Sequence, residues 1–167
     1  MASRDRGIRV LRATRAHLDA LTDLFVPYLA FYRREHDRDR VREFLSERLA
    51  RKESVIFVAI EGTGANASTV GFVQLYPTFS SLRLSRMWVL NDLYTAPDAR
   101  RRGVAHLLIS AARTMAVGTS ATHLELLTAR DNHAAQRVYE SAGFCRDEQF
   151  CRYGQDLVRR EEPVFSG

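Results

Sequence analysis

The stretch MWVLNDLYTAPDARRRGVAHLL, residues 87–108, decides the fold. Residues 87–95 are rich in apolar and aromatic side chains, so they predict a buried strand. Pro97 cannot donate a hydrogen bond to a sheet and therefore ends this strand. From Gly103 onward apolar residues recur at helical spacing, which predicts a helix that begins near Val104. The stretch thus predicts a strand, a tight turn and a helix, in that order.

The turn in this stretch has the chemistry of an anion site. The first turn of a helix leaves backbone N–H groups without partners and carries the positive end of the helix dipole. Arg100, Arg101 and Arg102 stand where this helix begins, and guanidinium groups bind phosphate through charge-assisted hydrogen bonds. Gly103 lets the backbone come close to a ligand, and Ala105 leaves the approach uncrowded. Pyrophosphate is an anion that such a corner can bind.

Two motifs resemble those of the GNAT superfamily of N-acetyltransferases. Arg100-x-x-Gly103-x-Ala105 fits the acetyl-CoA-binding pattern Q/R-x-x-G-x-G/A of that family. Residues 132–144, NHAAQRVYESAGF, resemble its second pattern, N-x-x-A-x-x-x-Y-x-x-x-G-F. The motifs follow the family's order, and with their flanking elements the resemblance covers about residues 7–157. It implies a single domain over residues 1–167 with an α+β fold, a mixed, mostly antiparallel central sheet and helices on both faces.

The resemblance also implies which positions hold acetyl-CoA. In the family, the strand corresponding to residues 86–95 carries a bulge and diverges from the strand corresponding to residues 123–128. Its exposed backbone groups then pair with the pantetheine arm, as an added strand would. The pyrophosphate lies on the amides of the following helix start. The cofactor positions expected in this chain are Leu93, Tyr94, Thr95, Arg100, Arg101, Arg102, Gly103, Val104, Ala105, Asn132 and Ala135.

Two residues are candidates for the catalytic chemistry. Tyr139 lies two helical turns after Asn132, and a phenol can protonate a sulfur as it leaves. Core packing is the alternative for Tyr139, because it also belongs to an apolar helix stripe. Asp92 is the candidate base, and strand alternation places it on the side of Leu90 and Tyr94 unless a bulge reverses this. The alternative for Asp92 is a structural carboxylate at a strand end.

The sequence of the strand that contains Asp92 also indicates a branch of the family and a class of acceptor substrate. Residues 88–94 resemble the L-E-D-F-F segment of spermidine/spermine acetyltransferases and the corresponding strand of histone/polyamine-acetyltransferase-like proteins. A glutamate stands in the former where this chain has Asn91, so one carboxylate is missing here. In the family, the connection between the first two helices lines the acceptor side, so we expect residues 28–36 to govern specificity. The acceptor can be a small-molecule amine or a protein lysine.

The remaining pattern predicts the other elements in turn. Residues 8–12 alternate as a strand, and a helix follows from an N-cap at Thr14 to about residue 32, kinked or split at Pro27. A second helix spans about residues 39–51. Further strands are expected at 55–60, at 70–75 with an end near Pro77, and at 123–128, and the last strands at 144–157. The helix from Val104 ends near residue 116.

Composition narrows the function classes. The 167 residues contain 46% hydrophobic residues, enough to build a core, and no apolar run approaches the ~20 residues of a membrane span. The start of the sequence has no signal-peptide pattern, so we expect a cytoplasmic protein without a membrane partner. Cys145 and Cys151 are the only cysteines and no zinc spacing occurs, so we expect no metal. The net charge of +5 could suggest nucleic acid, but the arginines are scattered among acids, which argues against that partner.

These observations predict an N-acetyltransferase that moves the acetyl group of acetyl-CoA to a primary amine by direct attack. The alternative is a non-catalytic module that binds acyl-CoA and in which Asp92 and Tyr139 only pack. We also expect a homodimer, because Phe144, Phe150 and Tyr153 could furnish an apolar edge of the last strands for a second copy.

Overall fold

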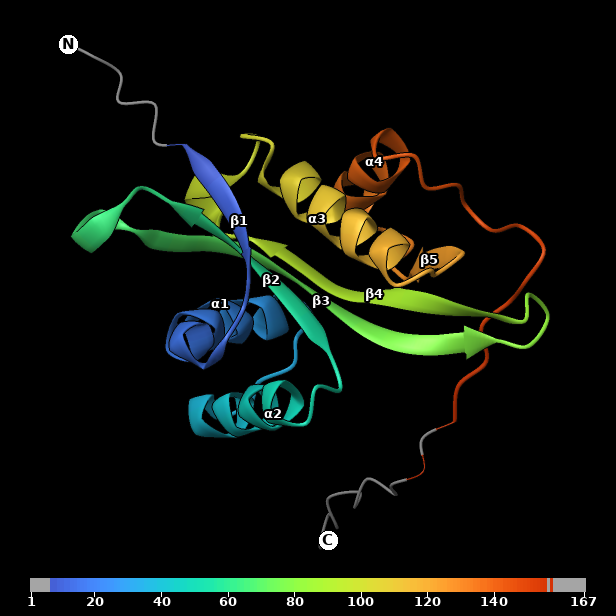
Figure 1. Cartoon of the computed structure of the whole chain (residues 1–167), viewed down its shortest axis with the longest axis horizontal. Coiled ribbons are helices and arrows are strands. Elements are labelled where there is room, and N and C mark those ends of the chain that lie inside the picture. Colours follow the sequence, from blue (N-terminus) through green and yellow to red (C-terminus); the bar gives the residue numbers. More distant parts are fainter. Residues whose placement is uncertain (1–6, 156, 158–167) are drawn as a thin grey trace, which may run out of the picture.

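The computed structural model describes residues 7–155 and 157, and it is built on one sheet of five strands. The strands lie in the order β1-β2-β3-β4-β5 (Figure 1) and span Ile8–Arg12, Val55–Glu61, Ser68–Ser80, Ser85–Thr95 and His123–Leu126. Neighbouring strands are antiparallel, except that β4 and β5 are parallel. The mixed, mostly antiparallel sheet expected from the sequence is therefore confirmed.

Helices cover both faces of this sheet, as expected. The described residues form four α-helices: α1 (Leu18–Phe31), α2 (Arg38–Ala50), α3 (Val104–Gly118) and α4 (His133–Ser141). Short 3-10 helices span Arg15–His17, Gly64–Asn66 and Pro97–Ala99. Figure 1 shows α1 and α2 on one face and α3 and α4 on the other. The hydrophobic core accordingly has two parts, one on each face of the sheet.

The start of α3 lies close against the sheet because of Gly71 in β3. A Cβ atom at Gly71 would lie 2.8 Å from the carbonyl oxygen of Tyr94 and 3.1 Å from Cγ1 of Val104. Val104 and Leu108 are fully buried, so the first turns of α3 are anchored on the sheet. The helix therefore begins directly beside the end of β4, as the strand–turn–helix pattern predicts.

A bulge interrupts β4 at Asn91. Gln74 of β3 pairs with Asp92 and Leu75 pairs with Leu90, so Asn91 is an extra residue on β4. Such a bulge reverses the alternation of side chains beyond it. Leu90 packs on the α3 side of the sheet, whereas Asp92 and Tyr94 face α1. The expectation that Asp92 shares a side with Leu90 is therefore wrong, and its shared side with Tyr94 is right.

Two prolines, Pro27 and Pro77, do not end the helix and the strand in which they lie. Helix α1 continues through Pro27, which is on its exposed side, because Phe25 stacks on Phe72 at 4.6 Å and Tyr28 meets the same ring edge-on. Strand β3 continues past Pro77 to Ser80. Residue 55, at the start of β2, pairs with Leu75, so Pro77 lies where β3 has only β4 beside it, a position where the missing N–H is tolerated.

The last strands expected over residues 144–157 do not form among the described residues. This segment has no helix or strand, and Phe150 and Tyr153 are exposed. The Asp147 carboxylate accepts hydrogen bonds from the amides of Gln149 and Phe150 at 2.8 and 3.1 Å. Such a local turn competes with strand pairing for the same backbone groups. The shared strand edge that we expected for a homodimer is therefore absent from the described segment.

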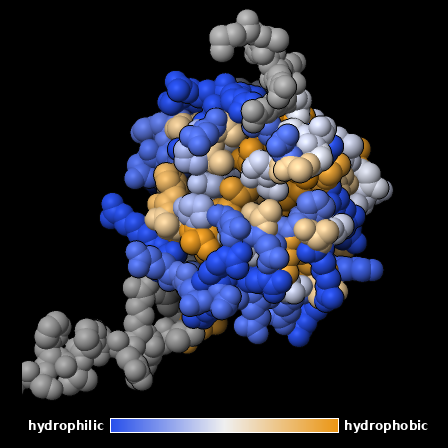
Figure 2. Space-filling view, turned by 90° about the vertical axis from the view of Figure 1, so that its left-hand side faces the viewer, coloured by the Kyte–Doolittle hydropathy of each residue, from blue (hydrophilic) through white to orange (hydrophobic). Residues whose placement is uncertain are grey.

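The surface is mostly polar. Figure 2 shows hydrophilic residues over most of one face, with hydrophobic residues between them, as expected where amphipathic elements bury only one side. In the part of the chain that the structure describes, no helix is both long and apolar enough to cross a membrane.

Candidate active site

The turn before α3 has an open backbone at Gly103. This residue is the N-cap of α3 with a φ of 78°, a left-handed conformation that favours glycine. Its cap position has no side-chain hydrogen bond, and no atom lies within 4 Å of the place where a Cβ would stand. The N-terminus of α3 therefore has open space beside Gly103 and no side-chain cap, and the amides of a helix's first turn are the donor set that an anion requires.

The three arginines of the turn have different surroundings. Arg102 forms a bidentate ion pair with Glu61 of β2 at 2.7 and 3.2 Å, and this pair raises its pKa. Arg100 donates from Nε to the carbonyl oxygen of Thr95 at 3.2 Å and lies 6.0 Å from the ring centre of Tyr94. Arg101 has a φ of 60° and is exposed. The sequence run alone cannot show that Arg102 is held on the sheet by Glu61.

Within the described residues, the end of β4 has one edge without a strand beside it. Strand β5 pairs with residues 87–90 of β4, and this pairing stops at Leu90 and Leu126. Leu93, Tyr94 and Thr95 pair with β3 on the other side only. The strands thus separate at the bulge, which is the divergence expected from the sequence, and the edge of residues 93–95 can pair with an extended ligand.

Asp92 is held by two hydrogen bonds at this point of separation. Its Oδ1 accepts a hydrogen bond from the Tyr28 hydroxyl at 2.7 Å, and its Oδ2 accepts one from Nδ2 of Asn91 at 3.0 Å. The residue is only 8% exposed. Burial raises the pKa of Asp92, and the two hydrogen bonds act in the opposite direction because they favour the ionised form. A partly desolvated carboxylate of this kind is a stronger base than an exposed one.

The charge of Asp92 also acts on three further tyrosines, Tyr139, Tyr76 and Tyr32. Burial raises the pKa of Tyr139 of α4 to about 12, and the charges of Tyr32 and Asp92 add to the shift. Burial also raises the pKa of Tyr76 of β3 to about 12, again with a contribution from Asp92. The pKa of Tyr32 is raised by burial, and a hydrogen bond with the Asn132 side chain offsets part of this rise. Asp92 and these tyrosines, the Asp92 cluster, are thus linked by electrostatic interaction, and the raised pKa values keep the phenols protonated at neutral pH.

The motif of α4 serves local structure as well. Asn132 caps the helix, since its side chain accepts a hydrogen bond from the Ala135 amide at 3.1 Å. Tyr139 packs against the core on the α3 side and meets the ring of Phe144 at 5.9 Å. Both the capping role of Asn132 and the packing of Tyr139 that the sequence allows are thus present in the fold.

A pocket of about 490 Å³ opens beside this cluster. It is lined by Tyr28 and Tyr32 of α1, residues 89–91 of β4, residues 127–129 after β5, and Arg152. The sequence placed the acceptor side at residues 28–36, and two aromatic residues of that segment line the pocket. Tyr28 and Tyr32 are four residues apart on one helix face, a spacing that could have singled them out. No sequence signal points to Arg152.

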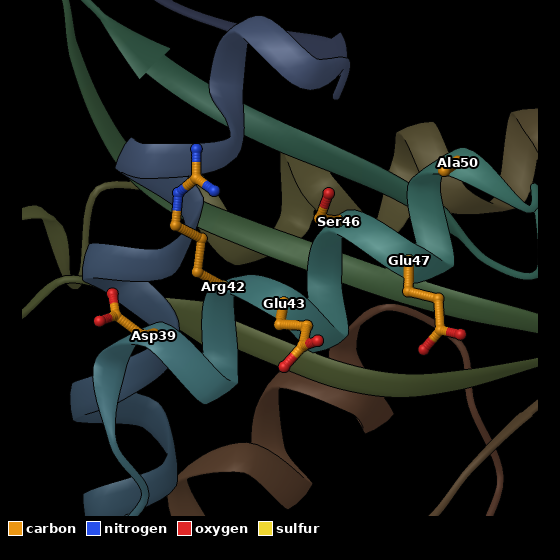
Figure 3. Close-up of a pocket in the computed structure, with 6 residues that line it drawn as sticks. All are labelled: Asp39, Arg42, Glu43, Ser46, Glu47 and Ala50. Carbon is orange, nitrogen blue, oxygen red and sulfur yellow. The ribbon is translucent and has the colours of Figure 1, made fainter.

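A second hollow lies on the outer face of α2 (Figure 3). The side chains that line it all come from this one helix: Asp39, Arg42, Glu43, Ser46, Glu47 and Ala50. Arg42 is paired with Asp19 of α1 at 2.7 Å. This hollow contains no group from the motifs at residues 100–105 and 132–144 or from the Asp92 cluster, so it is a feature of the helix surface. Within residues 7–155 and 157, no group of three or more acidic, histidine or cysteine side chains could hold a metal ion.

Comparisons with known proteins agree on one family. The model of the Acetyltransferase (GNAT) family matches residues 18–144. The uncharacterized N-acetyltransferase YhfO of Bacillus subtilis (strain 168) is 38% identical over 146 residues, which are 87% of this chain and 95% of that protein. A crystal structure of a probable acetyltransferase is 45% identical with a TM-score of 0.83, and the match covers 91% of this chain and 99% of that one.

A more distant structure shows the same fold with a ligand. An aminoglycoside N-acetyltransferase solved in complex with CoA has a TM-score of 0.77 at 20% identity, and the match covers 93% of this chain and 99% of that one. The family match and the 38% identical relative both span most of the sequence, including the turn before α3 and the bulge of β4. The chain belongs to the Acetyltransferase (GNAT) family and is an acetyl-CoA-dependent N-acetyltransferase.

Proposed function

We propose that this enzyme acetylates a primary amine by direct attack, with Asp92 as the general base and Tyr139 as the general acid. The observation that carries the proposal is the buried Asp92 carboxylate. Tyr28 and Asn91, which both line the pocket, hold it by hydrogen bonds, and its charge acts on Tyr139. The bulge of β4, the pocket lined by Tyr28 and Asn91, and the influence of the Asp92 charge on Tyr139 together support this proposal.

The Asp92 carboxylate has the task of freeing the amine. A primary ammonium group has a pKa of about 10.4 and is mostly charged at neutral pH. Burial raises the pKa of Asp92, so its carboxylate holds a proton more readily than an exposed one. Asp92 accepts a proton from the ammonium group, directly or through one water molecule, and leaves the nitrogen lone pair ready for attack.

Tyr139 supplies the proton that the leaving group needs. Attack of the amine on the thioester carbonyl carbon forms a C–N bond and breaks the C–S bond. The hydroxyl of Tyr139 gives its proton to the departing sulfur, and the second proton released by the nitrogen restores the phenol through solvent. A pKa of about 12 keeps this hydroxyl protonated until the sulfur takes the proton. No nucleophilic side chain is needed.

The residues at the start of α3 and along β4 fit acetyl-CoA, which supplies the acetyl group as a thioester. The open amides from Gly103 to Ala105 suit the pyrophosphate, and the free edge of residues 93–95 suits the pantetheine arm. Arg101 is the arginine of the turn best able to reach a phosphate, since Arg102 is paired with Glu61. Asn132 and Ala135 at the start of α4 complete the proposed cofactor contacts.

The acceptor we propose is a small-molecule amine. A pocket of about 490 Å³ is in the range of small-molecule sites. The structurally similar aminoglycoside N-acetyltransferase acts, by its name, on a small amine. A polyamine acceptor, as in the branch that residues 88–94 resemble, and a protein lysine are the other acceptors that the test must include.

The test is acetyl-CoA turnover, followed as thiol release, against a panel of small amines, polyamines and a lysine peptide. We expect at least one small amine to raise thiol release well above the rate with acetyl-CoA and water alone. If the protein binds CoA but no amine in the panel accelerates thiol release, the proposal is wrong.

We also propose that the protein is a homodimer. Phe150 and Tyr153 are 71% and 92% exposed in the single chain, and large apolar side chains of this kind are commonly covered by a partner. Light scattering across a range of concentrations tests this, and a monomer throughout would contradict it.

A further inference from the structure

The pocket next to Asp92 contains one further charged group. Among the residues that line it, Arg152 is the only charged one. Its guanidinium is exposed and forms no ion pair with any residue in the described part of the chain. The pocket therefore presents a free cation on its wall, while the carboxylate of Asp92 lies behind Tyr28 and Asn91.

These two charges come from distant parts of the sequence: Arg152 lines the pocket, and Asp92 is held by the lining residues Tyr28 and Asn91. Asp92 is on β4, whereas Arg152 is in the segment after α4 that forms no strand. A molecule in the pocket thus meets the exposed guanidinium of Arg152, while the groups that hold the Asp92 carboxylate belong to the same lining.

We propose that the acceptor is a small amine that also carries an anionic group, a carboxylate or a phosphate. The inference rests on the proposed function, in which the amine is directed toward Asp92. Guanidinium groups bind carboxylate and phosphate oxygens through two parallel charge-assisted hydrogen bonds, so Arg152 is a specificity-determining residue for that anion. A second ammonium group in the same place would be repelled, so the pocket selects against polyamines and other polycations.

The other residues that line the pocket fit an acceptor with an apolar carbon chain between two charged ends. Tyr28 and Tyr32 present ring faces and edges, and Thr128 and Asn91 supply polar atoms between apolar residues. An aromatic wall accommodates the carbon chain between the two charged ends and favours the cationic end of the molecule.

The experiment compares matched acceptors of the same chain length: an amino carboxylate, an amino phosphate, a diamine and the plain monoamine. We expect the highest kcat/KM with one of the two anionic amines, and their ranking separates carboxylate from phosphate. Arg152→Ala should lower kcat/KM for that acceptor about 10- to 100-fold, mainly through KM, and leave the monoamine unchanged. Arg152→Glu should invert the order and favour the diamine.

Arg146→Ala is the matched control, because Arg146 is an exposed arginine of the same segment and does not line the pocket. It should leave all four acceptors unchanged. A diamine or monoamine that equals the anionic amines, or an Arg152→Ala defect in the KM for acetyl-CoA alone, would overturn this inference while the proposed function stands. Absence of turnover with every amine overturns the proposed function and this inference with it.

Discussion

The hydroxyl of Tyr28 donates a hydrogen bond of 2.7 Å to Oδ1 of Asp92, across 64 positions of the chain. It joins the last turn of α1 to the bulge of β4. The ring of Tyr28 is itself fixed by edge contacts with Phe25, Phe72 and Tyr94, at centroid distances of 5.4 to 6.1 Å. Tyr28 is therefore a positioning residue for the proposed base, and the aromatic cluster sets where its hydroxyl points.

Tyr28→Phe should shift the acid limb of the pH profile of kcat/KM to higher pH. Burial already raises the pKa of Asp92, and the bond from Tyr28 lowers it, so loss of the hydroxyl raises the pKa further. The rate should fall below neutral pH and recover as the pH rises. Tyr32→Phe is the control, since Tyr32 contributes a ring to the same cluster but makes no hydrogen bond to Asp92. An unchanged acid limb in Tyr28→Phe would mean that Asp92 is not the base.

Asp92→Asn should stabilise the fold at neutral pH while it removes the base. The folded pKa of Asp92 lies above the unfolded value, so the folded state binds more protons between those two values. Stability is then lost as the pH rises through this window, and a neutral amide avoids the loss. We expect a higher Tm than the parent above the window and no advantage below it, measured by thermal unfolding at a series of pH values.

The same variant should retain a small activity that depends on the acceptor. Without the base, only the fraction of amine that is already deprotonated can attack, so the residual rate should climb with pH. Parental turnover over the whole pH range would show that Asp92 has only a structural role.

Tyr139→Phe should lower turnover by about 10²- to 10⁴-fold, the range of general acid catalysis. The ring contact with Phe144 is kept, so the fold and the CoA affinity should change little. The rate of thiol release measures turnover, and calorimetry with CoA measures the CoA affinity. A variant as active as the parent would restrict Tyr139 to packing and leave the positioning of the two substrates to account for the rate.

Gly103→Val should weaken CoA binding, because a branched side chain in the open space before α3 obstructs the approach of the pyrophosphate. The left-handed φ of 78° also strains any residue with a Cβ, at about 1–2 kcal/mol. Gly64→Val is the matched control: Gly64 also has a positive φ of 59° and open space, but it lies in the β2–β3 connection. Calorimetry should show a loss of CoA affinity for Gly103→Val only. Equal affinities would contradict the cofactor site at α3.

The sequence by itself determined the strand–turn–helix unit of residues 87–108 and the start of α4. These features depend on neighbours in the chain: apolar periodicity, a proline that ends a strand, a glycine at a left-handed N-cap, and an asparagine that caps a helix. Alternation of apolar and basic residues also sufficed for β1, and an apolar run before a hairpin loop sufficed for β2; the bounds of both strands lie within one residue of those expected.

Only the tertiary structure decided the surroundings of these elements. The bulge at Asn91 turns Asp92 toward α1, and whether a residue is extra depends on the register with β3. Strand β3 continues through Pro77 because β2 begins opposite Leu75 and leaves no β2 residue beside the proline. The Arg102 pair with Glu61 joins a helix start to a strand. The apolar residues of 144–157 predicted strands, yet the turn at Asp147 is what forms. Pairing and burial between distant segments settle such choices, because the local pattern leaves more than one partner open for the same backbone groups.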